Sequence, residues 1–173
     1  MTNEGNTSIA HKKLIAVCGP GSTATPELEE LAYRVGRELA LNGLGVVCGG
    51  MGGVMLAACK GAKEVGGLTV GIVPSYNRND ANPFVDFVIC TGLGEARNML
   101  VSATGMAIIA VGGEWGTLSE IALGLKINRP VITIQGQGWK ISRASSNIYD
   151  IIPGLLLDAL TPEEAVKLVM QNI

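Results

Sequence analysis

Charge is scarce in this chain, in which only 16% of the 173 residues are Asp, Glu, Lys or Arg, against about 25% in an average globular protein. The formal net charge is -2 and the sequence pI is about 5.4. We therefore expect no electrostatic binding of nucleic acid, which needs a basic surface. A surface with so little charge also suggests that part of it is buried between subunits.

Histidine is almost absent, because His11 is the only one. It lies in a polar N-terminal segment, so histidine-based acid–base catalysis and a serine–histidine triad are not expected. The cysteines show no C-x-x-C spacing and no neighbouring histidines, which disfavours zinc, so we expect buried thiols and no metal site. They are Cys18, Cys48, Cys59 and Cys90.

Long apolar runs are also missing. None reaches the ~18 residues that a membrane span needs, and Met1 to Ala10 lack the apolar stretch of a signal peptide. We therefore expect a cytoplasmic protein that makes no membrane contact. Residues 1–12 are predicted to form a flexible tail, and residues 13–173 a single domain.

Glycine is abundant, with 24 residues, and it gathers in turns that follow short apolar runs. These runs alternate with longer segments of helical periodicity, which is typical of βαβ units. The sequence therefore predicts an α/β, Rossmann-like, doubly wound sheet, mostly parallel, with helices on both faces. The predicted strands are 14–18, 44–48, 68–73, 85–90, 106–111 and 131–134. The predicted helices are 26–41, 54–65, 95–104, 117–127 and 162–172, and residues 136–154 are predicted to be irregular.

Three glycine-rich turns each join a predicted strand to a predicted helix: Gly19–Gly21, Gly49–Gly53 and Gly112–Gly116. Right-handed βαβ crossovers bring all such turns to the carboxyl edge of the sheet. The first N–H groups of a helix lack partners and carry partial positive charge, and glycine lets a phosphate approach them closely. The sequence therefore predicts a phosphate-binding site at this edge, although tight turns also need glycine for backbone geometry alone.

Familiar nucleotide motifs are incomplete here. Residues 19–24 fit G-x-G-x-x-A only loosely, and the second predicted strand ends at Cys48 and Gly49, where dinucleotide-binding proteins carry an acidic ribose anchor. NAD is therefore not expected. The sequence holds no G-x-x-x-x-G-K-[ST], which excludes a P-loop NTPase at the level of the motif.

Three side chains near the predicted edge have two interpretations each. Arg97 has the planar guanidinium that suits a phosphate, or it is a solvated surface residue. Glu120 ends the run Thr117–Glu120, which matches a helix capping box, or it faces the ligand as a base or hydrogen-bond acceptor. Trp115 either stacks on a flat heterocycle or packs against the protein. Local sequence does not separate these alternatives.

Four segments occur in an order that resembles a known superfamily: Cys48–Met55, Gly66–Pro74, Arg97–Asn98 and Gly112–Glu120. They resemble the Rossmann-like, lysine-decarboxylase-like superfamily that contains the "lonely guy" cytokinin-activating phosphoribohydrolases and the molybdenum cofactor carrier proteins. In the phosphoribohydrolases, residues at the positions of Arg97 and Glu120 cleave the N-glycosidic bond of a nucleoside 5′-monophosphate. The resemblance implies that these two residues are catalytic if the chain is such an enzyme.

The chain departs from the phosphoribohydrolase pattern at three places. Val111 replaces a proline, Asn98 replaces a lysine, and Gly52–Met55 replaces G-L-M-G. These departures resemble the carrier branch, which implies a non-catalytic binding protein for molybdenum cofactor (molybdopterin). The alternative is a nucleoside 5′-monophosphate phosphoribohydrolase, and a nucleotide sensor of the same fold is a third interpretation.

The resemblance also implies a homodimer or homotetramer, with molybdoenzymes or cofactor-biosynthesis proteins as partners. The residues expected to contact the phosphate-bearing ligand are Gly19, Gly21, Ser22, Gly49, Gly50, Met51, Gly52, Gly53, Pro74, Arg97, Asn98, Gly112, Gly113, Glu114, Trp115, Gly116, Thr117 and Glu120.

Overall fold

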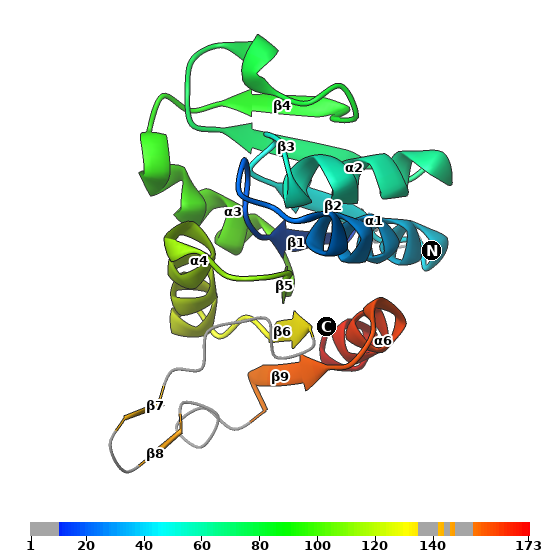
Figure 1. Cartoon of the computed structure of the whole chain (residues 1–173), viewed down its shortest axis with the longest axis vertical. Helices are drawn as coiled ribbons and strands as arrows, with labels where there is room; N and C mark the ends of the chain where they lie inside the picture. Colours follow the sequence, from blue (N-terminus) through cyan, green and yellow to red (C-terminus); the bar gives the residue numbers. More distant parts are fainter. Residues whose placement is uncertain (1–10, 135–141, 144–145, 148–153) are drawn as a thin grey trace, which may run out of the picture.

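A parallel sheet of seven strands runs through the part of the chain that this computed structural model describes, residues 11–134, 142–143, 146–147 and 154–173. The strand order is β4-β3-β2-β1-β5-β6-β9, and every neighbouring pair is parallel (Figure 1). The strands are β1 Leu14–Cys18, β2 Gly45–Cys48, β3 Thr69–Val73, β4 Phe87–Cys90, β5 Ile108–Ala110, β6 Val131–Ile134 and β9 Leu156–Ala159. The predicted Rossmann-like α/β fold is confirmed.

Helices cover both faces of this sheet (Figure 1). One face carries α1 Pro26–Leu41, α2 Val54–Glu64 and α6 Pro162–Asn172, and the other carries α3 Asn98–Thr104 and α4 Trp115–Lys126. Two short 3-10 helices, Arg78–Asp80 and Gly94–Arg97, follow β3 and β4. A separate antiparallel pair joins β7 Ser142–Arg143 to β8 Ser146–Asn147.

The alternation of side chains along β1 shows how the sheet divides the core. Ile15 and Val17 point into the cluster under α1, α2 and α6, whereas Ala16 and Cys18 point into the cluster under α3 and α4. All four are fully or almost fully buried. Burial on both faces explains why the strands are continuous apolar runs, since each buried Ile or Val contributes about 1.5–3 kcal/mol.

The helices α1 and α6 begin at side-chain caps that the sequence displays. Thr25 precedes Pro26, and its hydroxyl accepts a hydrogen bond from the Leu28 N–H. Thr161 caps α6 in the same way, by accepting from the Glu164 N–H. Both helices therefore begin where the sequence predicts, because side-chain caps act over three residues.

Besides β7 and β8, which lie in the segment predicted to be irregular, three elements differ from the prediction. The strand β9 is missing from it, because only Leu156 and Ala159 of this short edge strand are buried and its pairing with β6 is what defines it. The helix predicted over 95–104 begins as the 3-10 helix and becomes α3 at Asn98. The helix predicted from Thr117 begins at Trp115. The predicted tail falls mostly on residues 1–10, and Trp139 and Tyr149 of the predicted irregular segment also lie outside the described residues.

The topological switch point of the sheet lies at β1. The chain adds β2, β3 and β4 on one side of β1, and then β5, β6 and β9 on the other. The α2 and α3 helices therefore lie on opposite faces beside this point, which leaves a crevice at the carboxyl ends of the central strands. None of the described helices is long and apolar enough to span a membrane.

The four cysteines are free thiols, and of these only Cys18 lines the pocket described below. Cys18, Cys48 and Cys59 are buried and Cys90 is half-buried, and none forms a disulfide. The Sγ atoms of Cys48 and Cys59 are 3.5 Å apart, at the boundary between β2 and α2.

Candidate functional site

A pocket of ≈ 990 Å³ lies at the carboxyl edge of the sheet, where the central strands end. It receives residues from all three glycine-rich turns, so the predicted convergence of these turns is present. The predicted residues that line it are Gly19, Gly21, Gly49, Met51, Arg97, Asn98, Gly113, Glu114, Trp115, Gly116, Thr117 and Glu120. The predicted residues outside its lining are Ser22, Gly50, Gly52, Gly53, Pro74 and Gly112.

The turn before α2 is largely occupied by the protein itself. Gly53 has φ 60° and ψ -130°, and a Cβ there would collide with the backbone of Pro20 and Gly21. The N–H of Val54, the first residue of α2, donates to the Pro20 carbonyl at 3.0 Å. The Asn82 amide donates to the carbonyl of Met51 at 2.9 Å. Gly53 therefore serves close backbone packing, which the sequence had allowed as one interpretation, whereas a Cβ on Gly52 would meet nothing within 4 Å.

The start of α4 differs from that of α2. Glu114 is the N-cap residue, and its side chain forms no cap hydrogen bond to the helix. The first-turn residues Trp115, Gly116 and Thr117 line the pocket. A Cβ on Gly116 would meet nothing closer than the Asn98 Nδ2 atom at 3.9 Å. The positive end of this helix therefore borders the pocket, an arrangement that attracts anions.

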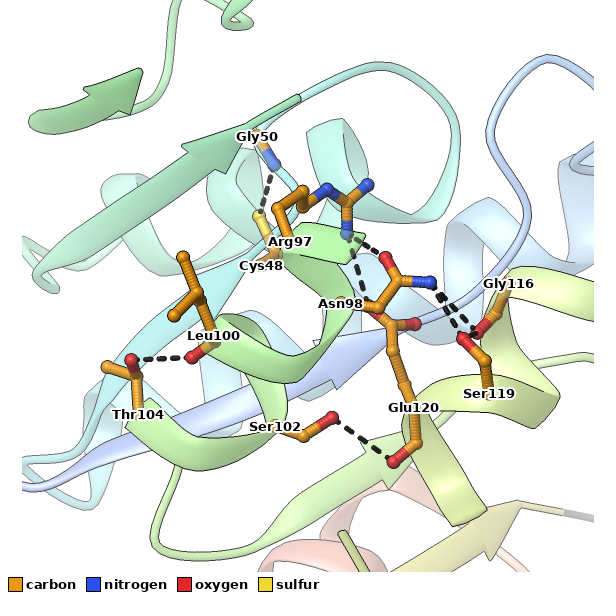
Figure 2. Close-up of polar contacts among 10 residues, drawn as sticks. All are labelled: Cys48, Gly50, Arg97, Asn98, Leu100, Ser102, Thr104, Gly116, Ser119 and Glu120. Carbon is orange, nitrogen blue, oxygen red and sulfur yellow. Dashed lines mark hydrogen bonds and ion pairs between the residues drawn. The ribbon is translucent and has the colours of Figure 1, made fainter. Parts of the chain in front are cut away.

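A buried ion pair forms the floor of the site (Figure 2). Arg97 and Glu120 are only 5% and 6% exposed, and Arg97 Nη1 lies 3.3 Å from Glu120 Oε1. The Arg97 Nε atom is buried and has no hydrogen-bond partner in the described part of the chain. Leaving such a donor unpaired costs about 1–3 kcal/mol.

Gly49 makes room for this arginine. A Cβ on Gly49 would lie 2.5 Å from Arg97 Nη2 and 2.7 Å from Met55 Sδ. The glycine at the end of β2 is therefore required because the guanidinium lies directly over the backbone. The glycine pattern predicts a phosphate contact for Gly49, whereas its close contact in the structure is with the side chain of Arg97.

Burial raises the pKa of Glu120 from 4.5 to about 7. The Arg97 charge and a hydrogen bond with Cys18 oppose this rise, and the Glu95 charge adds to it. The pKa of the Cys18 thiol is also raised, by burial and then by the charge of Glu120. Desolvation thus outweighs the ion pair, so Glu120 exchanges its proton near neutral pH.

The capping-box interpretation of Glu120 is wrong. Because α4 begins at Trp115, Thr117 lies inside the first turn and is not its cap. The Glu120 carboxylate is directed at Arg97, which precedes α3 (Figure 2). The solvated-surface interpretation of Arg97 is wrong as well, because the side chain is buried.

Apolar side chains form the remaining wall of the pocket. Trp115 is 77% exposed and lines the pocket together with Met51, Met55, Met99 and Leu123. Aromatic and thioether side chains offer flat and adaptable contacts to a heterocycle.

Sequence reasoning did not assign several lining residues to the site: Cys18, Met55, Glu95, Met99, Ser119 and Leu123. Cys18 immediately precedes the first glycine turn, and Glu95 opens the segment that carries Arg97. Their neighbourhood was therefore a signal that could have found them. No group of three or more His, Cys, Asp or Glu side chains in the described ranges is arranged to hold a metal ion.

The sheet order and the pocket at its switch point define a Rossmann-like α/β protein with a candidate ligand site at the carboxyl edge. The chain belongs to the SLOG cluster4 family, whose family model matches residues 12–166. The resemblance to "lonely guy"-like proteins drawn from the sequence is thereby confirmed.

Two relatives illustrate the range of sequences that this chain resembles. A protein of Archaeoglobus fulgidus, described as uncharacterized, is 43% identical over 157 residues, which make up 88% of this chain and 91% of that protein. The cytokinin riboside 5′-monophosphate phosphoribohydrolase of Mycobacterium marinum is 34% identical over 111 residues, which make up 62% of this chain and 59% of the enzyme.

Two solved structures are similar over nearly their whole length. The molybdenum cofactor binding protein of the phototrophic bacterium Rippkaea orientalis has a TM-score of 0.82 at 36% identity, covering 93% of this chain and 97% of that one. The molybdenum cofactor carrier protein of Chlamydomonas reinhardtii has a TM-score of 0.83 at 32% identity, covering 93% of this chain and 98% of that one.

Proposed function

We propose that this chain binds and carries a phosphate-bearing pterin, of the kind found in the molybdenum cofactor. The observation that carries the proposal is the Arg97 guanidinium, which lines the pocket together with the first turn of α4. Guanidinium and helix N–H groups together suit a terminal phosphate. The similarity to two molybdenum cofactor binding and carrier proteins supports the choice of ligand.

The rest of the pocket supports a ligand larger than a phosphate. Its volume of ≈ 990 Å³ lies at the upper end of the range for small-molecule sites, about 300–1,000 Å³. Trp115 offers an aromatic face, and Glu95 and Glu114 bring carboxylates to the lining. Carboxylates accept hydrogen bonds from the amino and N–H groups at the edge of a pterin ring. The phosphate would then lie against Arg97 and the ring would lie nearer the mouth.

Equilibrium titration with purified cofactor tests this proposal. We expect saturable binding by the full chain, and a loss of at least about tenfold in affinity for Arg97→Ala, which removes a charge-assisted contact. Arg37→Ala is the matched control, because Arg37 lies on α1 in a weak surface pair with Glu64 at 3.9 Å. Absence of saturable binding, or an equal loss in both variants, would disprove the assignment.

A phosphoribohydrolase is the second candidate, and one observation favours it. Glu120 has a pKa of about 7 and lies 3.3 Å from Arg97, which suits a general base at neutral pH. In this reaction Glu120 would activate water or stabilise the developing charge on the ribose, and Arg97 would orient the substrate. Release of free base and ribose 5-phosphate from nucleoside 5′-monophosphates, abolished by Glu120→Ala, would establish the enzyme and overturn the carrier proposal.

We also propose that the protein is a homodimer or homotetramer. Phe87 and Ile89 of β4 are 63% and 46% exposed, and they pair in register with Val70 and Ile72, which face α3 and α4. An apolar sheet face in water favours a protein partner. Light scattering should give at least twice the chain mass, and Ile89→Lys should reduce it, whereas the exposed control Met170→Lys on α6 should not. A monomeric wild-type mass contradicts the proposal.

A carrier of this kind would work in the cytoplasm and exchange its cargo with molybdoenzymes or with cofactor-biosynthesis proteins. The assay is transfer of bound cofactor to an apo-molybdoenzyme, measured as recovered enzyme activity. Transfer no faster than from free cofactor would count against this role.

A further inference from the structure

Asn98 is held at both ends of its side-chain amide (Figure 2). Its Oδ1 atom accepts a hydrogen bond from Arg97 Nη1 at 2.6 Å. Its Nδ2 atom donates to Ser119 Oγ at 2.7 Å and contacts the Gly116 carbonyl at 3.5 Å. The residue is 4% exposed. Its hydrogen-bonding capacity is therefore used mainly by the protein, and a direct contact with a ligand is not its main role.

The two ends of this amide reach two different anion-attracting elements. One is the Arg97 guanidinium, which precedes α3. The other is the first turn of α4, where Ser119 Oγ also donates to the Gly116 carbonyl at 2.7 Å. We propose that Asn98 is a positioning residue that fixes the guanidinium of Arg97 relative to the N-terminus of α4, so that both meet the same anion. This inference rests on the proposed anion site.

Asn98 also competes with Glu120 for the Nη1 group of Arg97. Arg97 Nη1 is shared between Asn98 Oδ1 at 2.6 Å and Glu120 Oε1 at 3.3 Å, so the shorter contact is with the neutral amide. Without the amide oxygen, Nη1 is expected to move toward Glu120, which is the only other acceptor that it contacts in the described chain. A closer pair would favour the ionised carboxylate and withdraw positive charge from the pocket.

The groups that act on Glu120 come from each neighbouring element. Cys18 belongs to β1, and Glu95 and Arg97 belong to the 3-10 helix before α3. Cys48 at the end of β2 interacts electrostatically with both Arg97 and Glu120. Asn98 is neutral, so its replacement by leucine adds no charge near Glu120; the added apolar surface can only raise the Glu120 pKa, whereas a move of Arg97 toward Glu120 lowers it. The titration of Glu120 therefore reports the position of the arginine, which a purely structural role of Asn98 would leave unchanged.

The test compares Asn98→Leu with wild type in two measurements on the full chain. The first follows the Glu120 carboxyl by carbon-13 NMR over pH 5–9 without ligand, with the signal assigned from Glu120→Gln. We expect the Glu120 midpoint to be lower in Asn98→Leu than in wild type. The second measures the affinity for adenosine 5′-monophosphate at pH 6, where we expect at least about a tenfold loss, typical for a lost charge-assisted contact.

Three further variants keep the inference falsifiable. Thr104→Ala is the control on the same helix, because its hydroxyl donates only to the Leu100 carbonyl at 2.7 Å (Figure 2), and it should change neither measurement. Ser119→Ala releases the α4 end alone, and should weaken nucleotide binding without lowering the Glu120 midpoint. Asn98→Ala replaces the leucine variant if that one does not fold.

An unchanged Glu120 midpoint in Asn98→Leu overturns the inference, whatever happens to affinity. If wild type binds neither the nucleotide nor inorganic phosphate, the proposed anion site fails, and a lowered midpoint in Asn98→Leu then shows only that Asn98 holds Arg97 away from Glu120. If binding is lost without a change in the midpoint, Asn98 has only a structural role.

Discussion

Replacing Glu120 by glutamine should stabilise the protein, although the substitution removes one partner of a buried ion pair. Two effects oppose each other at this position. Loss of a buried charge partner usually destabilises, whereas removal of a desolvated carboxylate stabilises. The raised pKa of Glu120 shows that desolvation outweighs the attraction of Arg97. Glutamine also keeps an oxygen that can accept from Arg97 Nη1.

The sign and size follow from proton linkage. The folded chain holds the Glu120 proton up to about pH 7, whereas the unfolded chain releases it near 4.5. The stabilising effect of the protonated group is therefore complete below pH 4.5, and it is lost as the pH rises to about 7. At about 1.4 kcal/mol for each pH unit, the loss amounts to about 3 kcal/mol. Glu120→Gln does not lose this contribution.

Urea unfolding of both proteins between pH 5 and pH 8.5 measures the effect. The free energies of unfolding should differ little at pH 5 and should differ by up to about 3 kcal/mol at pH 8 in favour of glutamine. Glu64→Gln, an exposed glutamate at the end of α2, is the control and should follow wild type. A glutamine variant less stable than wild type at pH 8, or a difference that does not grow with pH, would refute the reasoning.

Three further predictions concern the replacement of two turn glycines and one helix cap by alanine. Gly53→Ala should destabilise by about 3 kcal/mol or more, because the position has φ 60° and a Cβ would meet the Gly21 backbone; a thermal melt near the wild-type midpoint contradicts this. Gly116→Ala should keep or slightly raise the melting temperature, since alanine favours helices, yet it should weaken phosphate binding because its methyl group enters the pocket; unchanged binding would remove α4 from the site. Thr161→Ala should cost about 1 kcal/mol through the lost cap on Glu164, measured by urea unfolding, and no change would show that this cap is dispensable.

The fold was largely predictable because its signals are local. Each buried strand is a short apolar run, and each long helix has an apolar stripe, so periodicity identifies them without knowledge of the tertiary structure. The caps Thr25 and Thr161 act within three residues, and both helices begin as predicted. The strand β9 escaped prediction because only its pairing with β6, more than twenty residues earlier in the chain, distinguishes it from a loop.

The candidate site was predictable in place but not in detail. Glycines occur in both the turn before α2 and the turn before α4. Gly53 allows close packing against the backbone of Pro20 and Gly21, whereas Gly116 borders the pocket. The sequence pattern of the two turns is similar, although the protein itself excludes a Cβ at Gly53 and leaves room for one at Gly116. Whether a backbone segment or a ligand lies against the glycine depends on segments that are distant in the chain.

The amino-acid sequence by itself determined the alternation of strands and helices up to β6, and with it the edge of the sheet where a ligand can bind, because right-handed crossovers bring the strand-to-helix turns to one edge. The tertiary structure alone decided that Glu120 faces Arg97 instead of capping its own helix. These residues are 23 positions apart, and they meet only because α3 and α4 pack on the same face of the sheet. Burial of that pair, and the proton affinity that follows from it, arises from this packing and from no local pattern.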